Sequence, residues 1–165
     1  MIEGVKIKEL KSIPDERGFL MEMLRCDDEI FEGFGQVYIT GCKRGIAKAW
    51  HYHREQTDHF VCVWGRSLVV LYDMRKESAT FGAIEEYILE APPPCNSQPA
   101  TLNAQLLLKI PPMVVHGFAA ADCDEARIIN IPTLPYRYKS PDELRFPWDS
   151  KDIPYTWPSY IKTGG

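Results

Sequence analysis

Residues 60–72 read FVCVWGRSLVVLY, a run of β-branched and aromatic residues interrupted by Gly65-Arg66-Ser67. Such residues favour strands, and a short interruption that contains glycine favours a turn. The stretch therefore predicts two strands joined as a hairpin.

Similar short runs continue on both sides, separated by turn-forming residues. The chain has 13 prolines among 165 residues, which leaves few segments able to hold a long helix. The further strands that we expect cover residues 4–10, 19–24, 36–40, 47–51, 83–89, 105–110, 114–119 and 126–130. The helix candidate is the acidic segment 27–32, one or two turns long. The pattern predicts an all-β barrel or double-sheet sandwich with short helical turns.

The length and composition fit one globular domain. The chain is 45% apolar and 25% charged, enough for a core but too short for two ordinary domains. We expect a single domain over residues 1–165, with an exposed Pro-rich loop at 91–103. The Pro-rich C-terminal segment, 132–165, is expected to lie over the barrel in extended pieces.

The charge and the cysteines exclude several classes of partner. Nineteen Lys and Arg against 23 Asp and Glu give a net charge of −4, which argues against general binding to nucleic acid or an anionic membrane. No apolar run approaches the roughly 18 residues of a bilayer span, and the start lacks the apolar core of a signal peptide. The five cysteines are scattered without a CxxC pair, which favours reduced thiols. We therefore expect a cytoplasmic protein.

All four histidines fall in two places, His51, His53 and His59 in one stretch and His116 after a Pro-Pro pair. His51 and His53 are two residues apart, so on a strand they point to the same face. Together with Asp58, these side chains predict a polar cluster that either performs acid–base chemistry or binds a divalent transition metal.

The spacing of this cluster resembles the two cupin motifs, which meet inside one small β-barrel. The first motif reads Gly45-x5-His51-x-His53-x4-Asp58-x6-Gly65, with Asp58 in place of the usual Glu. In the second, Met113 stands where a turn glycine is usual. If a metal is bound, its expected ligands are His51, His53, Asp58 and His116.

Six further pieces of the chain, in order, are similar to the dTDP-4-dehydrorhamnose 3,5-epimerase family of cupins. The pieces are residues 15–22, Gln36, 48–51, 73–82, 116–118 and 140–143, with Trp148 and Trp157-Pro158. The resemblance spans residues 4–158 and implies a cupin double-stranded β-helix, or jelly roll. It also implies a homodimer that exchanges the strand 5–10, a nucleotide-diphosphate sugar as ligand, and no metal or other cofactor.

The resemblance implies roles for individual residues. His51 matches the general base, which removes the proton beside a keto group. Arg17, Phe19, Glu22 and Gln36 match residues that hold the nucleotide diphosphate. Lys48, His53, His59, His116 and Asn130 are expected to complete the sugar site, with His59 near the sugar oxygen.

Two features depart from the family. Asn130 stands at or near the general-acid tyrosine, and an amide cannot deliver a proton at neutral pH. The aspartate that orients the base is absent, so Asp73 is the candidate substitute, and Tyr136 or Tyr138 are candidates for the phenol.

Three functions remain open at this point. The first is epimerisation of a dTDP-4-keto-6-deoxyhexose at one or two carbons, for deoxysugar or surface polysaccharide biosynthesis. The second is a sugar 3,4-ketoisomerase. The third is a non-catalytic or metal-binding cupin that recognises a sugar nucleotide.

Overall fold

The structure is a computed structural model that describes residues 1–92 and 105–165. Most of the expected loop at 91–103, and Cys95 within it, lie outside the described residues. The described parts consist of strands, turns and bends, and they contain no helix.

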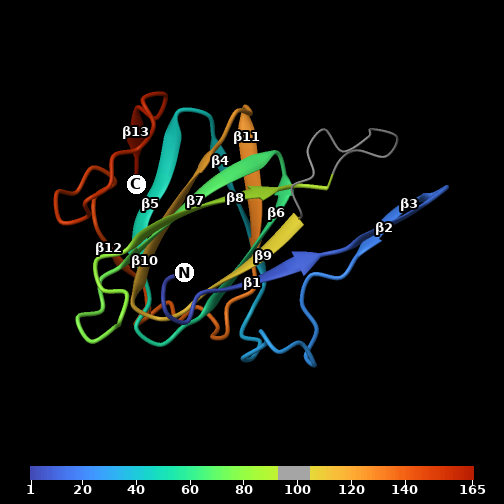
Figure 1. The fold of residues 1–165 in the computed structure, drawn as a ribbon, viewed down its shortest axis with the longest axis horizontal. Coiled ribbons are helices and arrows are strands. Elements are labelled where there is room, and N and C mark those ends of the chain that lie inside the picture. Colours follow the sequence, from blue (N-terminus) through green and yellow to red (C-terminus); the bar gives the residue numbers. More distant parts are fainter. Residues whose placement is uncertain (93–104) are drawn as a thin grey trace.

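Two antiparallel sheets face each other around a common interior (Figure 1). The first sheet has the spatial order β1 (Lys6–Leu10), β9 (Gln105–Ile110), β6 (Asp58–Trp64), β11 (Glu125–Asn130) and β4 (Tyr38–Lys43). The second has the order β12 (Leu144–Arg145), β5 (Ile46–Tyr52), β10 (Val114–Ala120), β7 (Arg66–Asp73) and β8 (Ile84–Glu90). A short strand, β13 (Thr163–Gly164), pairs with β5 in parallel. This arrangement confirms the predicted all-β cupin jelly roll.

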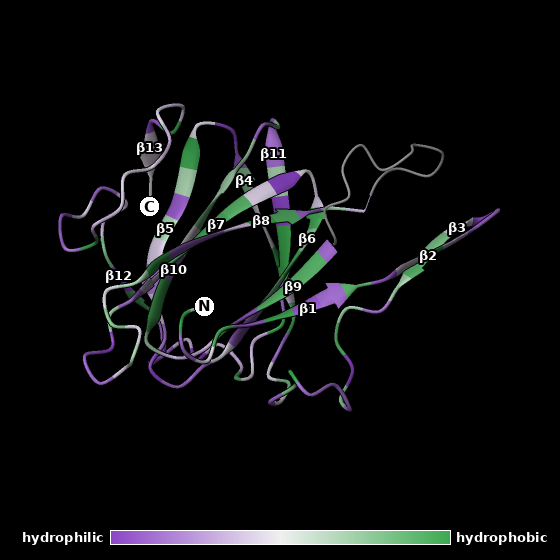
Figure 2. Cartoon of the chain, in the orientation of Figure 1, coloured by the Kyte–Doolittle hydropathy of each residue, from purple (hydrophilic) through white to green (hydrophobic). Residues whose placement is uncertain are grey.

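The core lies between the two sheets, where the strands of Figure 2 are mostly apolar. Phe60, Leu71, Leu108 and Phe118 are all at most 2% exposed. The Phe60 and Phe118 rings meet edge to face, with centroids 6.3 Å apart. Burying each such side chain contributes about 2–3 kcal/mol to folding, so this core fixes the relative position of the sheets.

The predicted hairpin over residues 60–72 is wrong. Both strands form, but β6 pairs with β9 and β11 while β7 pairs with β8 and β10. The chain passes from one sheet to the other at Gly65, whose φ is +68°. A Cβ there would lie 2.3 Å from the Glu125 carbonyl oxygen, so only glycine fits this corner. An apolar run identifies a strand but not its partner.

The helix expected at 27–32 is also absent. The segment forms turns, closed by the Asp28 N–H to the Arg25 carbonyl and the Phe31 N–H to the Asp28 carbonyl. The Asp28 carboxylate accepts bonds from the Arg25 N–H and the Lys8 ammonium. These side-chain bonds favour a turn over a helix.

The N-terminal strand that is expected to be exchanged in a homodimer pairs within its own chain in this structure. Residues 6–10 form β1, which pairs with β9 of the same chain. Among the described strands, the following two, β2 (Ser12–Asp15) and β3 (Gly18–Met21), pair with each other alone and project away from the barrel (Figure 1).

The C-terminal segment covers the outer face of β5. Ile153, Trp157 and Ile161 are buried together with Trp50, whose indole N–H donates to the Trp148 carbonyl at 3.0 Å. Residues 132–165 therefore pack on the barrel as the sequence predicts.

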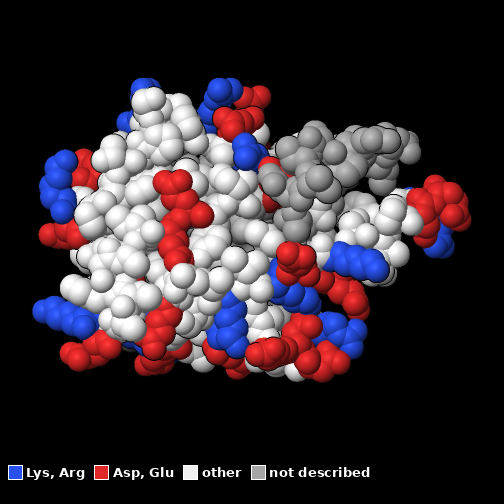
Figure 3. Space-filling view, in the orientation of Figure 1, with Lys and Arg blue, Asp and Glu red and all other residues white. Residues whose placement is uncertain are grey.

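The face in Figure 3 carries both signs of charge around its rim and a short acidic strip across a mostly uncharged middle, without a continuous basic area. Within the described ranges, no helix combines the length and the apolar character needed to cross a bilayer.

Candidate active site

A cavity of about 530 Å³ opens between the two sheets at one end of the barrel. Its wall contains residues from β4, β5, β6, β10 and β12 and from the segment before β12. The lining residues are Gln36, Tyr38, Thr40, Lys48, Ala49, Trp50, His51, His53, Gln56, Phe60, Phe118, Tyr136, Tyr138, Glu143, Arg145 and Gly165. The volume suits a small-molecule ligand.

The predicted polar cluster forms at the inner end of this cavity. One ligand atom each from His51, His53, Asp58 and His116 lies within 4.8 Å of the others. β5 carries His51 and leads into His53, β6 begins at Asp58, and β10 carries His116. A register shift between β5 and β10 separates the pair His116–His51 from the pair Phe118–Lys48. Such bulges commonly re-aim side chains beside a site.

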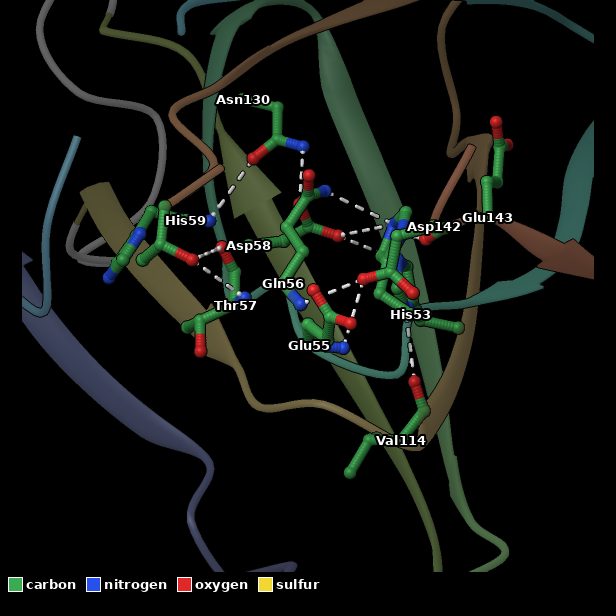
Figure 4. A network of polar contacts seen from close by, with 12 residues as sticks. His53, Glu55, Gln56, Thr57, Asp58, His59, Val114, Asn130, Asp142 and Glu143 are labelled. Atoms are coloured by element: carbon green, nitrogen blue, oxygen red, sulfur yellow. Dashed lines mark hydrogen bonds and ion pairs between the residues drawn. The ribbon is translucent and has the colours of Figure 1, made fainter. Parts of the chain in front are cut away.

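Asp58 is the centre of the cluster (Figure 4). Its Oδ1 accepts hydrogen bonds from Gln56 Nε2 and Asn130 Nδ2, each at 2.8 Å. Its Oδ2 lies 3.2 Å from Nε2 of His53 and 3.2 Å from Nε2 of His116. Burial alone would raise the pKa of Asp58, but the two imidazoles hold it well below its usual range. The carboxyl is therefore ionised.

Backbone carbonyls orient two of the imidazoles. Nδ1 of His53 contacts the Asp142 carbonyl oxygen, and Nδ1 of His116 lies 3.0 Å from the Val114 carbonyl oxygen (Figure 4). Because a carbonyl can only accept, Nδ1 carries the proton in both rings. Nε2 of each ring then faces Oδ2 of Asp58. Burial lowers the pKa of His53, and Asp58 raises it above its ordinary value.

His51 lies beside the cluster and faces the cavity. Its ring centroid is 4.0 Å from that of His116. Burial, and secondarily the His116 imidazole, hold the pKa of His51 well below its usual value. The neutral imidazole has the lone pair that a general base needs.

Tyr38 is a site residue that the sequence reasoning missed. It pairs with Asn130 across β4 and β11, and its hydroxyl accepts a 2.9 Å hydrogen bond from Asn130 Nδ2. Burial, with Asp58 nearby, raises the pKa of Tyr38 to about 12. The phenol stays protonated and can donate into the cavity. Its place two residues after Gln36 was the available signal, since both then share a strand face.

Cations line the same cavity. Lys48 was predicted, and its ammonium donates to the Thr40 hydroxyl at 2.9 Å. Arg145 was missed; it pairs in register with His51 and donates to Glu143 at 2.6 Å. Both side chains can form charge-assisted hydrogen bonds with an anionic ligand.

The other predicted residues of the cavity wall are in place. Gln36 lines the cavity, and its side-chain oxygen accepts a 3.2 Å bond from the Tyr136 N–H. Tyr136 and Tyr138 also lie on the wall, towards solvent.

His59 does not lie beside a bound sugar as expected. It follows Asp58 on β6, so its side chain points to the opposite face of the sheet. Its ring nitrogens contact the carbonyl oxygens of Ile131 at 2.9 Å and Ile30 at 3.2 Å. His59 is therefore fully buried against the backbone and has a structural role.

Asp73 does not serve as the partner of the base. Its carboxylate accepts bonds from Arg75, Ser78 and Thr80, which close the turn after β7. Asp73 is not among the residues of the cavity wall. Both carboxylate oxygens accept hydrogen bonds within the turn, so Asp73 has a structural role.

The predicted nucleotide residues Arg17, Phe19 and Glu22 lie outside the cavity wall of their own chain. Arg17 and Phe19 belong to the projecting β2–β3 hairpin, and Glu22 follows it. Arg17 is paired with Asp15, and Glu22 with Arg25. A single chain therefore does not bring these residues to His51.

The chain is similar to proteins of one known family. A family model described as dTDP-4-dehydrorhamnose 3,5-epimerase matches residues 1–163. The chain is 37% identical over 157 residues to the spore coat polysaccharide biosynthesis protein SpsL of Bacillus subtilis, covering 95% of this chain and 97% of that protein. It is 35% identical over 162 residues to the probable low-salt glycan biosynthesis epimerase Agl13 of Haloferax volcanii, covering 97% of each. A solved structure, the dTDP sugar isomerase from Desulfovibrio desulfuricans, superposes with a TM-score of 0.81 at 35% identity, covering 94% of this chain and 92% of that one.

Proposed function

Because the chain belongs to the dTDP-4-dehydrorhamnose 3,5-epimerase family, we propose that it is an isomerase of a nucleotide-linked 4-keto-6-deoxyhexose. The reaction inverts one or both carbons that neighbour the keto group. The names of its relatives support a role in the biosynthesis of a surface polysaccharide or glycan. The observation that carries the proposal is that His51 and Tyr38 face one cavity from opposite sheets.

The base is His51. Its Nε2 or Nδ1 removes the proton from the carbon beside the ketone, and the electron pair moves onto the carbonyl oxygen to give an enolate. Lys48 and Arg145 line the same space and can stabilise negative charge on that oxygen.

The acid is Tyr38. Inversion requires a proton to return to the face of the enolate opposite the base. Tyr38 lies on β4 of one sheet, whereas His51 lies on β5 of the other, so a sugar between them has one group on each side. Asn130 donates a hydrogen bond to the hydroxyl oxygen of Tyr38. The phenolic proton is not used in that bond, so Tyr38 can donate it to the substrate. The protonated His51 then releases its proton to water, and the Tyr38 phenolate takes one from water, which restores both groups.

A second copy of the chain would complete the nucleotide site. The β2–β3 hairpin exposes Phe19 and Leu20, 46% and 58% exposed, and two strands alone are marginally stable. In a homodimer, this hairpin can supply Arg17, Phe19 and Glu22 to the cavity of the other copy. Light scattering at micromolar concentration should give a dimer mass; a monomer would contradict this part.

The proposed location is the cytoplasm. Cys26, Cys42, Cys62 and Cys123 are free thiols, which fits a reducing compartment.

Solvent deuterium exchange tests the function. The protein is incubated in D2O with a dTDP-4-keto-6-deoxyhexose, and NMR follows label and configuration at each carbon. Deuterium beside the ketone with inversion supports epimerisation. Migration of the keto group would instead identify a ketoisomerase, and neither change with dTDP-, GDP- or UDP-linked substrates would leave a binding-only cupin.

A further inference from the structure

We propose that Glu143 selects substrates that carry a hydroxyl group on carbon 2 of the hexose. This inference rests on the proposed epimerase function and adds to it the substrate feature that the cavity recognises. Its basis is the position of one carboxylate on the cavity wall.

Glu143 differs in charge from the rest of that wall. In the described part of the chain, it is the only Asp or Glu side chain that lines the cavity, where Lys48 and Arg145 are the cations. The Glu143 side chain is 21% exposed. A carboxylate that is largely removed from water requires hydrogen-bond donors in its place.

Arg145 satisfies this requirement only in part. Its Nη2 donates to Oε1 of Glu143 at 2.6 Å, and among the described residues no hydrogen bond reaches Oε2. The Arg145 side chain is the outer member of the pair, 63% exposed. A carboxylate can accept about four hydrogen bonds. Glu143 therefore keeps acceptor capacity for a ligand in the cavity.

Glu143 lies between two fixed points of the chain. Before it, the Asp142 carboxylate accepts three backbone N–H groups from the loop 54–56. After it, β12 pairs with β5, where Arg145 lies opposite His51. Figure 4 shows the Glu143 carboxylate beside the polar cluster but outside it. A group that is held on both sides can select a ligand by geometry.

The partner of Glu143 is expected to be a neutral donor. An ammonium group on the ligand would meet the Arg145 guanidinium, which already pairs with this carboxylate, and like charges repel. A hydroxyl group donates a hydrogen bond without adding charge. Hydroxyl groups are the donors that a hexose offers.

The reaction itself decides which hydroxyl group suits a fixed acceptor. A 4-keto-6-deoxyhexose that is linked to the nucleotide through carbon 1 has free hydroxyl groups on carbons 2 and 3. Carbon 3 neighbours the ketone, so its hydroxyl group changes position when that carbon is inverted. The hydroxyl group on carbon 2 keeps its configuration, and an acceptor that binds it can hold the ring throughout the reaction.

The position of the acid agrees with this assignment. Burial is the main cause that raises the pKa of Tyr38 to about 12, followed by the charge of Asp58, and the charge of Glu143 also contributes. The Glu143 carboxylate is therefore close enough to act on the phenol. A sugar that is bound to Glu143 stays within reach of Tyr38.

The competing explanation is that Glu143 only orients Arg145. Glu125 and Arg127 on β11 form a pair with the same spacing along the chain, with Nε of Arg127 2.8 Å from Oε1 of Glu125. That pair is outside the cavity wall. A role in orientation alone would make the loss of Glu143 equally harmful for every substrate, whereas a bond to one hydroxyl group would not.

Solvent exchange with two substrates tests the proposal. The full chain is assayed in D2O with dTDP-4-keto-6-deoxyglucose and with its 2-deoxy analogue, and kcat/KM is measured for each. The parent should prefer the hydroxylated substrate about 100-fold, since a hydrogen bond to a charged group contributes in this range. Glu143→Ala should reduce the preference to less than about threefold. Glu143→Gln should retain about tenfold, because an amide oxygen accepts a weaker bond.

The controls separate this inference from the proposed function. Glu125→Ala removes the matched carboxylate and should keep the preference of the parent. Because every variant is assayed with both substrates, the difference in their intrinsic acidity cancels. If Glu143→Ala does not fold, the parent and Glu143→Gln still give the comparison.

Two results would overturn the selection by Glu143 while leaving the epimerase function intact. The first is exchange in the parent with equal kcat/KM for both substrates. The second is a Glu143→Ala variant that loses activity equally on both and keeps the preference, which would identify an orienting role. Absence of exchange with either substrate in the parent would contradict the proposed function, and this inference with it.

Discussion

The polar cluster in the cavity and the β2–β3 hairpin both contain residues predicted to bind the substrate, but they are built differently. Asp58 and His116 are 1% exposed and are held by several strands of one chain. Arg17 on the hairpin has a side chain that is 81% exposed, and its ion pairs among the described residues are with the sequence neighbours Asp15 and Glu16. A single chain can therefore position the reacting groups in advance, whereas the nucleotide residues need a further surface.

The sharpest way to separate the two regions is His51→Asn. We expect loss of deuterium exchange by about 1000-fold, since a general base contributes in this range. Nucleotide binding should change less than about threefold by calorimetry, because Asn keeps the size and polarity of the wall. Exchange that continues at the parent rate would contradict the assignment of the base.

Within the cavity, Tyr38→Phe separates the role of the acid from that of the base. Inversion should fall about 100-fold because the proton donor is lost, while exchange on the His51 face persists. NMR reads both quantities from the same sample. Tyr138→Phe is the matched control, since Tyr138 is on the cavity rim and 90% exposed. Equal loss of inversion in both variants would remove Tyr38 from the mechanism.

Asp73→Asn tests whether an interior carboxylate can be purely structural. Removing the charge leaves Arg75 without its partner and should lower the free energy of unfolding by about 3 kcal/mol. Exchange activity at 25 °C should stay unchanged. Asp149→Asn, at an exposed position, should change the free energy by less than about 0.5 kcal/mol.

The pH dependence of the free energy of unfolding provides a second measurement on Asp73→Asn. Burial would raise the pKa of Asp73, but Arg75, Thr80 and Ser78 lower it well below its usual value. Its stabilisation is therefore complete above about pH 4 and is lost as the pH falls through the lower folded value. The carboxylate of Glu3 also accepts a hydrogen bond from Ser78 at this turn, and Glu77 lies within it. Denaturant titrations should show a shallower acid limb for Asp73→Asn.

Arg17→Ala should have the smallest effect. Loss of one charge-assisted contact to a phosphate should weaken dTDP binding about tenfold without changing exchange at saturation. Arg44→Ala, another exposed arginine with its side chain 64% exposed, is the control. Equal affinities for both variants would argue that the hairpin plays no part in binding, and GDP and UDP titrations would identify the carrier.

The strands were predictable because each apolar run with turn residues at its ends is a local feature. Their pairing was not, because Gly65 joins two such runs without making them neighbours. The chain direction at this corner depends on the contact with Glu125, which is far away in sequence.

The cluster was predictable from spacing, since His51, His53 and His116 follow motif positions. His59 was misplaced because the resemblance outweighed the alternation of side chains along β6. Tyr38 was missed because its spacing from Gln36 indicates only a shared strand face. Its role depends on its pairing with Asn130, which the spacing along one strand does not reveal.

Asp142 links the C-terminal segment to the cluster. Its carboxylate accepts the N–H groups of Arg54, Glu55 and Gln56, and its carbonyl oxygen contacts His53. One residue thus holds both the loop and the ring orientation. In chimaeras made by exchanging segments between homologous proteins, residues 53–58 and 140–145 should therefore be inherited together, because a mismatched pair would misalign His53 even with every cluster residue present.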